Sequence, residues 1–184
     1  MTRYSAVAIG LHWLIAAAIV ALVAMGMVMT GLPDTELALK FSLYQWHKSV
    51  GITVLLLSLV RLAWRLTHRP PPLPAALRPW ERAAARITHV GFYVLIVTIP
   101  LLGWAMVSAS PYDIPTVLYG EIPWPHLPVA KAGFEALRAG HVLLAFGAVG
   151  LLALHVAAAL KHHFILKDDV LARMLPFLRR EVPE

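Results

Sequence analysis

The sequence predicts an all-α protein, an integral membrane bundle of four helices. Of its 184 residues, 59% are hydrophobic and 14% are charged, a balance typical of chains that sit in lipid. Four segments carry little or no charge, and each reaches the roughly 20 residues that a transmembrane helix needs. These segments are residues 4–33, 41–60, 87–112 and 139–160. They predict helices at about 6–30, 43–66, 80–108 and 136–164, all within one transmembrane domain, residues 1–184.

The first apolar segment resembles a secretion signal in position but not in length. Its run of apolar residues is longer than the 7–15 residues of a signal-peptide core. No convincing cleavage site separates it from the second segment. We therefore expect it to be retained as the first transmembrane helix.

Basic residues are distributed unequally between the two sides of the predicted bundle. The side with both termini and the second connection has Arg3, Arg61, Arg65, Arg69, Arg78, Arg82, Arg86, Lys161, Lys167, Arg173, Arg179 and Arg180. The other side has Lys40, Lys48, Lys131 and Arg138. Because short cytoplasmic connections carry the excess of Lys and Arg, both termini are predicted to be cytoplasmic. This orientation accounts for the net charge of +6 without any nucleic acid partner.

Both longer connections are rich in proline. Prolines between the second and third helices favour an extended cytoplasmic linker, because proline cannot continue a helix. They are Pro70, Pro71, Pro72, Pro74 and Pro79. The outer connection, residues 110–137, is long enough to act as a lid over a functional site, or it is a simple spacer. The sequence leaves both readings open.

Four histidines within the predicted helices fall at two depths. His141 and His155 are fourteen residues apart, close to four helical turns, so they share one face about 21 Å apart along the axis. Since consecutive helices alternate in direction, His12 has the depth of His155 in the cytoplasmic half. His47 has the depth of His141 in the outer half. Paired imidazoles inside a bilayer predict two haem groups, each with two axial histidines.

Other uses of these histidines remain possible. Imidazoles also suit zinc or copper, so a haem-free metal transporter is one alternative. Such sites usually add carboxylates or thiolates, and the predicted helices have none at these depths. The chain has no cysteine, which excludes thiolate-ligated haem, iron–sulfur clusters and covalently attached haem. Histidines that only hydrogen-bond within the bundle are a second alternative.

Several short motifs resemble those of the bacterial cytochrome b561 family. They are LHWL at residues 11–14, WHKSVGI at 46–52, THVG at 88–91 and LHVAAALKHHF at 154–164, followed by Lys167, Asp168, Arg173 and Met174. The resemblance extends over all four predicted helices. It implies a b-type cytochrome of the bacterial inner membrane with two haems, whose ligands fall on His12, His47, His141 and His155.

Within the family, the chain looks most like members that take electrons from superoxide at the periplasmic face and reduce ubiquinone. Lys48 and Arg138 flank the outer histidines, where they would attract superoxide or neutralise haem propionates. An alternative is an electron-transfer membrane anchor that links a separate dehydrogenase or periplasmic redox protein to the quinone pool.

Three more histidines are candidates for contacts with quinone or propionates. His89 could replace His12 opposite His155, contact a propionate or quinone, or tie helices together, and we favour a role other than iron ligand. His162 and His163 follow Lys161 at the predicted inner surface, where a quinone headgroup could meet a proton donor. Solvated interfacial histidines are the alternative for both.

Overall fold

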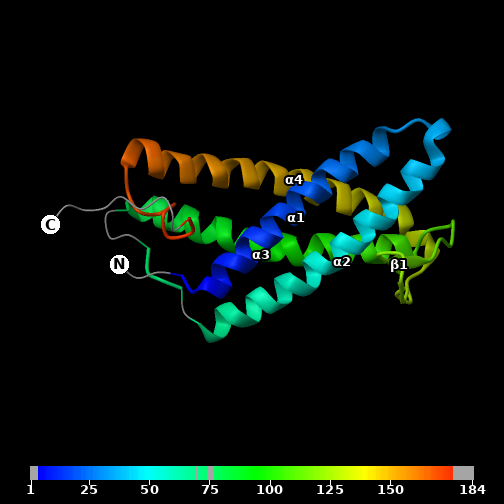
Figure 1. Ribbon diagram of the computed structural model, residues 1–184, viewed down its shortest axis with the longest axis horizontal. Helices are drawn as coiled ribbons and strands as arrows, with labels where there is room; N and C mark the ends of the chain where they lie inside the picture. Colours follow the sequence, from blue (N-terminus) through cyan, green and yellow to red (C-terminus); the bar gives the residue numbers. More distant parts are fainter. Residues whose placement is uncertain (1–3, 69, 74–76, 176–184) are drawn as a thin grey trace.

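The structure is a computed structural model that describes residues 4–68, 70–73 and 77–175. Within these residues it is a bundle of four long helices, each apolar enough to cross a membrane, which confirms the predicted fold class (Figure 1). The helices are α1 (Ala6–Gly31), α2 (Leu37–Thr67), α3 (Pro79–Ser108) and α4 (Phe134–Lys161). Of the residues used to predict orientation and the linker, Arg3, Arg69, Pro74, Arg179 and Arg180 lie outside the described residues.

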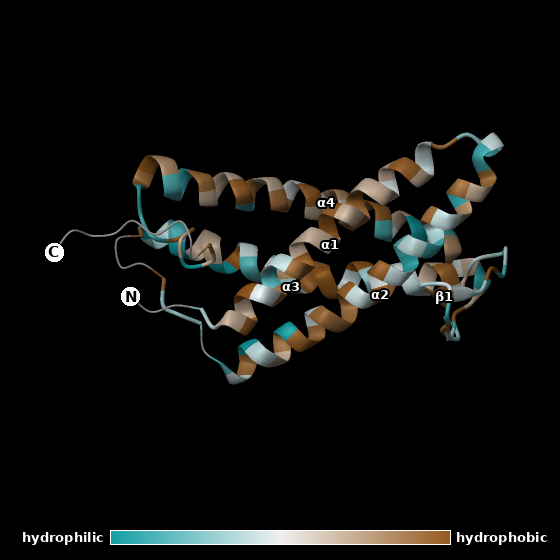
Figure 2. Cartoon of the chain, in the orientation of Figure 1, coloured by the Kyte–Doolittle hydropathy of each residue, from teal (hydrophilic) through white to brown (hydrophobic). Residues whose placement is uncertain are grey.

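The bundle consists of two antiparallel helix pairs, α1 with α2 and α3 with α4, and α2 packs against α3. Its small core is centred on α2, where Ile52, Val54 and Leu55 are buried. Large apolar side chains are exposed along the helices instead, and brown hydrophobic residues cover much of the ribbon in Figure 2. So much exposed apolar surface would be unfavourable in water but is favourable in contact with lipid, as expected of a membrane protein.

The helix boundaries extend beyond the predicted spans. α2 begins at Leu37 rather than at residue 43, because a short 3-10 turn, η1 (Asp34–Glu36), leads directly into it. α3 begins with Pro79 at its first position, where a missing N–H costs nothing. α4 continues beyond Lys161 as a π-helical turn, η3 (His162–Leu166). The start of α1, the end of α2 and the end of α4 lie at the same end of the bundle, which we call the inner end (Figure 1).

A β-hairpin occupies part of the outer connection, and the sequence did not predict it. Strands β1 (Thr116–Leu118) and β2 (Ile122–Trp124) pair in antiparallel register, with Leu118 opposite Ile122. At the tip, Tyr119 has a φ of 55°, a left-handed conformation that is costly for a side chain of this size. Its backbone N–H donates to Oγ of Ser49 at 2.9 Å, which fixes the hairpin against α2.

Candidate functional site

The outer pair of histidines comes from α2 and α4. The ring centroids of His47 and His141 are 6.3 Å apart, and the ring planes are inclined at 72°. Nδ1 of His141 is 3.0 Å from the carbonyl oxygen of Ile99 on α3, to which it donates when it carries the proton. Histidines that bind metals usually donate one ring N–H to a carbonyl, which leaves the other nitrogen free for the metal. With the proton on Nδ1, this hydrogen bond would leave Nε2 of His141 free to bind a metal.

Each outer histidine lies against a glycine of the neighbouring helix. A Cβ atom added at Gly103 would be 3.0 Å from Cε1 of His141 and 3.2 Å from its Nδ1. A Cβ atom at Gly26 of α1 would be 3.6 Å from Cε1 of His47. The absence of a side chain at Gly103 thus lets the imidazole approach the carbonyl of Ile99, one helical turn earlier. Both outer histidines therefore lie beside a glycine, but only the contact at Gly103 is closer than an ordinary van der Waals contact.

The inner end brings three imidazoles together. The ring centroids of His12 on α1 and His155 on α4 are 6.4 Å apart, with planes at 72°. His89 on α3 approaches the same ring, with centroids 5.9 Å apart and planes at 67°. Phe92, also on α3, has its ring edge-on to His155 at 5.3 Å. His155 is therefore flanked by two possible partners.

Helix packing favours His12 over His89 as the partner of His155 across a flat cofactor. α3 and α4 pack closely beside these rings, since a Cβ at Gly91 would be only 3.4 Å from Cδ2 of Leu151. A porphyrin between His89 and His155 would have to separate this contact. His12 reaches His155 from α1, and the close backbone packing of α1 is with α2 rather than with α4.

The spacing of both pairs fits axial ligands of haem iron. Metal–imidazole bonds are about 2 Å long, so two imidazoles on opposite sides of one iron have centroids roughly 6 Å apart. The outer pair meets this distance with His141 already oriented by Ile99. At the inner pair, Nη1 of Arg61 donates to Nδ1 of His12 at 3.0 Å, which leaves the proton of the neutral ring on Nε2. For His12 to hold an iron through Nε2, this proton would have to move to Nδ1, and Arg61 would have to take another partner.

The predicted cations of the outer side differ in their partners. Arg138 forms an ion pair with Glu135 at 2.8 Å, Lys40 pairs with Asp34 at 2.9 Å, and Lys131 pairs with Asp113.

Lys48, next to His47, instead donates from Nζ to the carbonyl oxygen of Pro115 at 3.2 Å. Its positive charge is thus not neutralised by a carboxylate within the described residues.

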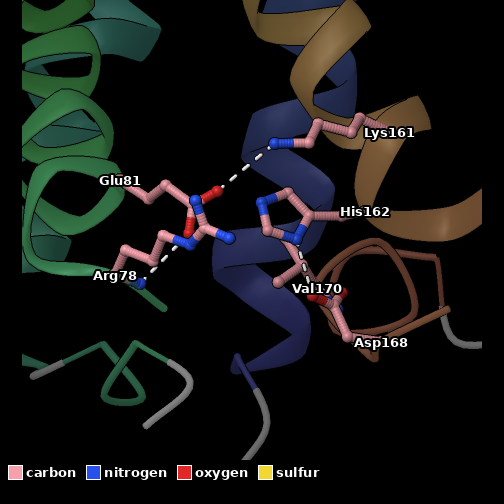
Figure 3. Close-up of polar contacts among 6 residues, drawn as sticks. All are labelled: Arg78, Glu81, Lys161, His162, Asp168 and Val170. Carbon is pink, nitrogen blue, oxygen red and sulfur yellow. Dashed lines mark hydrogen bonds and ion pairs between the residues drawn. The ribbon is translucent and has the colours of Figure 1, made fainter. Parts of the chain in front are cut away.

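At the inner end, polar side chains link α3, α4 and the segment after α4 (Figure 3). Nζ of Lys161 is 3.3 Å from Oε1 of Glu81, and Nδ1 of His162 is 2.6 Å from Oδ2 of Asp168. The other oxygen of Asp168 accepts from the backbone N–H of Val170 at 3.0 Å. His163 packs its ring against Phe164. Of the two adjacent histidines, His162 is therefore the one fixed by a carboxylate.

His162 also follows the spacing of the other α4 histidines. It is seven residues after His155, two helical turns along the chain, and His155 is fourteen residues after His141. The π-helical turn begins at His162 itself, so the α-helical register holds up to that residue. A group beside His162 would thus lie roughly 10 Å along the axis from His155 on the same face.

Sequence reasoning used Arg61 only as evidence of orientation and overlooked Gly26 and Gly103 altogether. Arg61 lies within α2, and an arginine inside a membrane helix is itself a signal of function. The glycines gave no sequence signal, because their role depends on which helix lies opposite. Within the described residues, no group of three or more His, Cys, Asp or Glu side chains is arranged to hold a metal ion.

Comparison with known proteins finds a family model and several relatives that cover nearly the whole chain. A family model described as prokaryotic cytochrome b561 matches residues 3–177. Cytochrome b561 homolog 2 of Escherichia coli (strain K12) is 35% identical over 176 residues, covering 94% of this chain and 91% of the relative. A probable superoxide oxidase, CybB of Yersinia pestis, is 30% identical over 181 residues, covering 95% of this chain and 96% of the relative.

Proposed function

Because the chain belongs to the prokaryotic cytochrome b561 family, and is thus a membrane b-type cytochrome that transfers electrons, we propose that it carries electrons from superoxide to ubiquinone. The likeness to a probable superoxide oxidase supports this choice of substrate. The net reaction oxidises two superoxide anions to dioxygen and reduces one quinone to quinol, with uptake of two protons. In this proposal the outer end faces the periplasm, and the protein spans the bacterial inner membrane with both termini cytoplasmic.

The observation that carries the proposal is the meeting of imidazoles at two levels of the bundle. His47 and His141 would hold one haem b, and His12 and His155 a second one. Haem b would supply one-electron redox chemistry, and an iron held by two imidazoles would have no open position for a substrate. Superoxide and quinone would therefore be recognised by the protein near the two groups rather than at the metal.

Lys48 is the residue we assign to the attraction of superoxide. It is adjacent to His47, and no carboxylate among residues 4–68, 70–73 and 77–175 pairs with its charge, whereas the charge of Arg138 is balanced by Glu135. A cation near the entrance raises the encounter rate of an anionic substrate. For Arg138, a structural role at the start of α4 is the better assignment.

The inner end offers a proton donor for quinone reduction. Asp168 fixes the orientation of His162 through Nδ1, which leaves Nε2 to exchange a proton with a bound headgroup. His162 shares the face of His155, so electron and proton would reach a quinone from the same side of α4. The ring of His163 lies edge-on to Phe164, and His163 has no such orienting partner among the described residues.

Stopped-flow spectroscopy of the haem-loaded protein tests the proposal. Mixing with a superoxide source should reduce the haem rapidly, and added ubiquinone should then reoxidise it. Slow reduction by superoxide combined with fast reoxidation by quinone would refute the assigned donor. That result would favour the electron-transfer anchor, which receives electrons from a separate dehydrogenase or a periplasmic redox protein.

A further inference from the structure

A groove of about 570 Å³ lies between α2 and α3, apart from the histidine pairs. Its walls are mostly aliphatic, with Leu62 and Leu66 from α2 and Val90 and Val94 from α3. Leu66, Val90 and Val94 are 77%, 63% and 56% exposed, so the groove opens on the lipid-facing surface. We call it the α2–α3 groove.

One cation stands in this apolar groove. The guanidinium of Arg65 lies over the ring of Tyr93, 5.3 Å from its centroid, and both residues line the groove. None of the ion pairs among the described residues includes Arg65. Arg61, one turn earlier, is bonded to His12, and Arg173 donates to the carbonyl of Pro72. Among the described residues that line the groove, Arg65 is the one with a charged side chain, so its guanidinium is available to a ligand that enters from the lipid.

Its position matches the level of phospholipid headgroups. Arg65 is two residues from the end of α2, and Trp64 beside it is typical of a membrane interface. Charged side chains in contact with lipid are costly unless they reach water or an anion. Arginine also binds phosphate through two parallel hydrogen bonds, a geometry that lysine cannot reproduce.

We propose that the α2–α3 groove binds one anionic phospholipid of the inner leaflet. Its phosphate binds Arg65, and one acyl chain lies along Leu62, Val94 and Val97 toward the middle of the bundle. Basic pockets between membrane helices on the cytoplasmic side are where anionic lipid headgroups bind. The aliphatic walls suit a hydrocarbon chain, and the positive charge of Arg65 favours a headgroup with a net negative charge over a zwitterionic one, which carries its own cation beside the phosphate. This site is independent of the proposed superoxide and quinone chemistry.

The competing partner for Arg65 is a propionate of haem at the inner pair, because Arg61 and Arg65 lie one turn apart. A propionate and a lipid phosphate predict different effects of removing Arg65. A propionate partner predicts that Arg65→Gln lowers haem content or shifts the reduction potential. A lipid partner predicts that haem content and potential stay as in the wild type, while binding of anionic lipid is lost.

The test is titration of the delipidated, haem-loaded protein in neutral detergent with dioleoyl phosphatidylglycerol, followed by native mass spectrometry and thermal unfolding. We expect one lipid to bind the wild type and to raise its Tm, while dioleoyl phosphatidylcholine has little effect. Arg65→Gln should weaken phosphatidylglycerol binding at least tenfold. Arg86→Gln, which removes the same charge from the exposed face of α3, is the matched control and should stay within twofold of the wild type.

A second variant tests the acyl-chain part of the site and keeps the arginine. Val94→Trp fills the groove, so it should also weaken phosphatidylglycerol binding. The proposal is overturned if Arg65→Gln binds the lipid as the wild type does, or if Arg86→Gln loses binding equally. It is also overturned if the two lipids bind with equal affinity, or if the wild type appears in the mass spectra as a dimer that binds no lipid.

Discussion

Gly103→Ala is the most direct test of how the outer histidine pair is built. The added methyl group would be 3.0 Å from Cε1 of His141, whereas favourable carbon contacts lie at about 3.5–4.0 Å. The imidazole must therefore retreat by about 0.5 Å. Its hydrogen bond to the Ile99 carbonyl, now 3.0 Å, would lengthen beyond the normal range of about 2.7–3.2 Å.

Loss of this orienting bond should weaken haem binding at the outer pair. Removal of such a partner typically lowers metal affinity 10–100-fold, or about 1.4–2.7 kcal/mol. We expect Gly103→Ala to lose haem from one site, or to shift the midpoint potential of one haem where both remain. Haem content by pyridine haemochrome assay and redox titration of the α-band measure these outcomes.

Gly26→Ala is the matched control, because its methyl group would meet Cε1 of His47 at an ordinary 3.6 Å. Both substitutions replace glycine by alanine inside a membrane helix, and alanine has the higher helix propensity by about 1 kcal/mol. The control should therefore keep its haem content and potentials. If Gly103→Ala matches the wild type in haem content, spectrum and midpoint potentials, the glycine contact has no role in placing His141.

The remaining predictions concern the inner pair, the outer cation and the proton donor. His12→Ala should lose one haem whereas His89→Ala should keep full haem content, and the reverse result would reassign the ligand. Lys48→Gln should slow haem reduction by superoxide about threefold at low salt, because two unit charges about 7 Å apart in water attract each other by about 0.6 kcal/mol. At high salt the variant and the wild type should be reduced at the same rate, because salt screens this attraction. Asp168→Asn should slow reoxidation of pre-reduced haem by ubiquinone about tenfold or more, with haem reduction by superoxide unchanged. Equal reoxidation rates in this variant and the wild type would limit Asp168 to a structural role.

The depths of the histidines could be inferred from the sequence, but the direction in which each ring points could not. Helical rise and alternating helix directions are enough to place His12 level with His155. They do not distinguish His12 from His89, because both lie near the same depth. The distinction depends on how closely α3 packs against α4 at Gly91, and this tertiary contact leaves no periodic pattern in the sequence.

The outer hairpin escaped prediction for a related reason. Each strand has only three residues, and Pro123 within β2 argues against a strand when the sequence is considered alone. Tyr119 at the tip adopts a conformation usually left to glycine or asparagine. Contacts with α2 support it, since its hydroxyl is 2.6 Å from Oγ1 of Thr53 and its ring packs edge-on against Trp46. Such support comes from residues about seventy positions away in the chain.

The two histidine pairs differ in how far they are prepared for a cofactor. At the outer pair, His141 is already anchored to a carbonyl through the nitrogen that would not bind iron. At the inner pair, Arg61 donates a hydrogen bond to Nδ1 of His12, and His89 lies beside the ring of His155 as a second possible partner. Haem binding at the inner pair would therefore include the cost of moving a proton and releasing Arg61, which would then be available to a haem propionate. If the two pairs hold haem as proposed, titration of the apoprotein with haem should fill the outer pair before the inner pair.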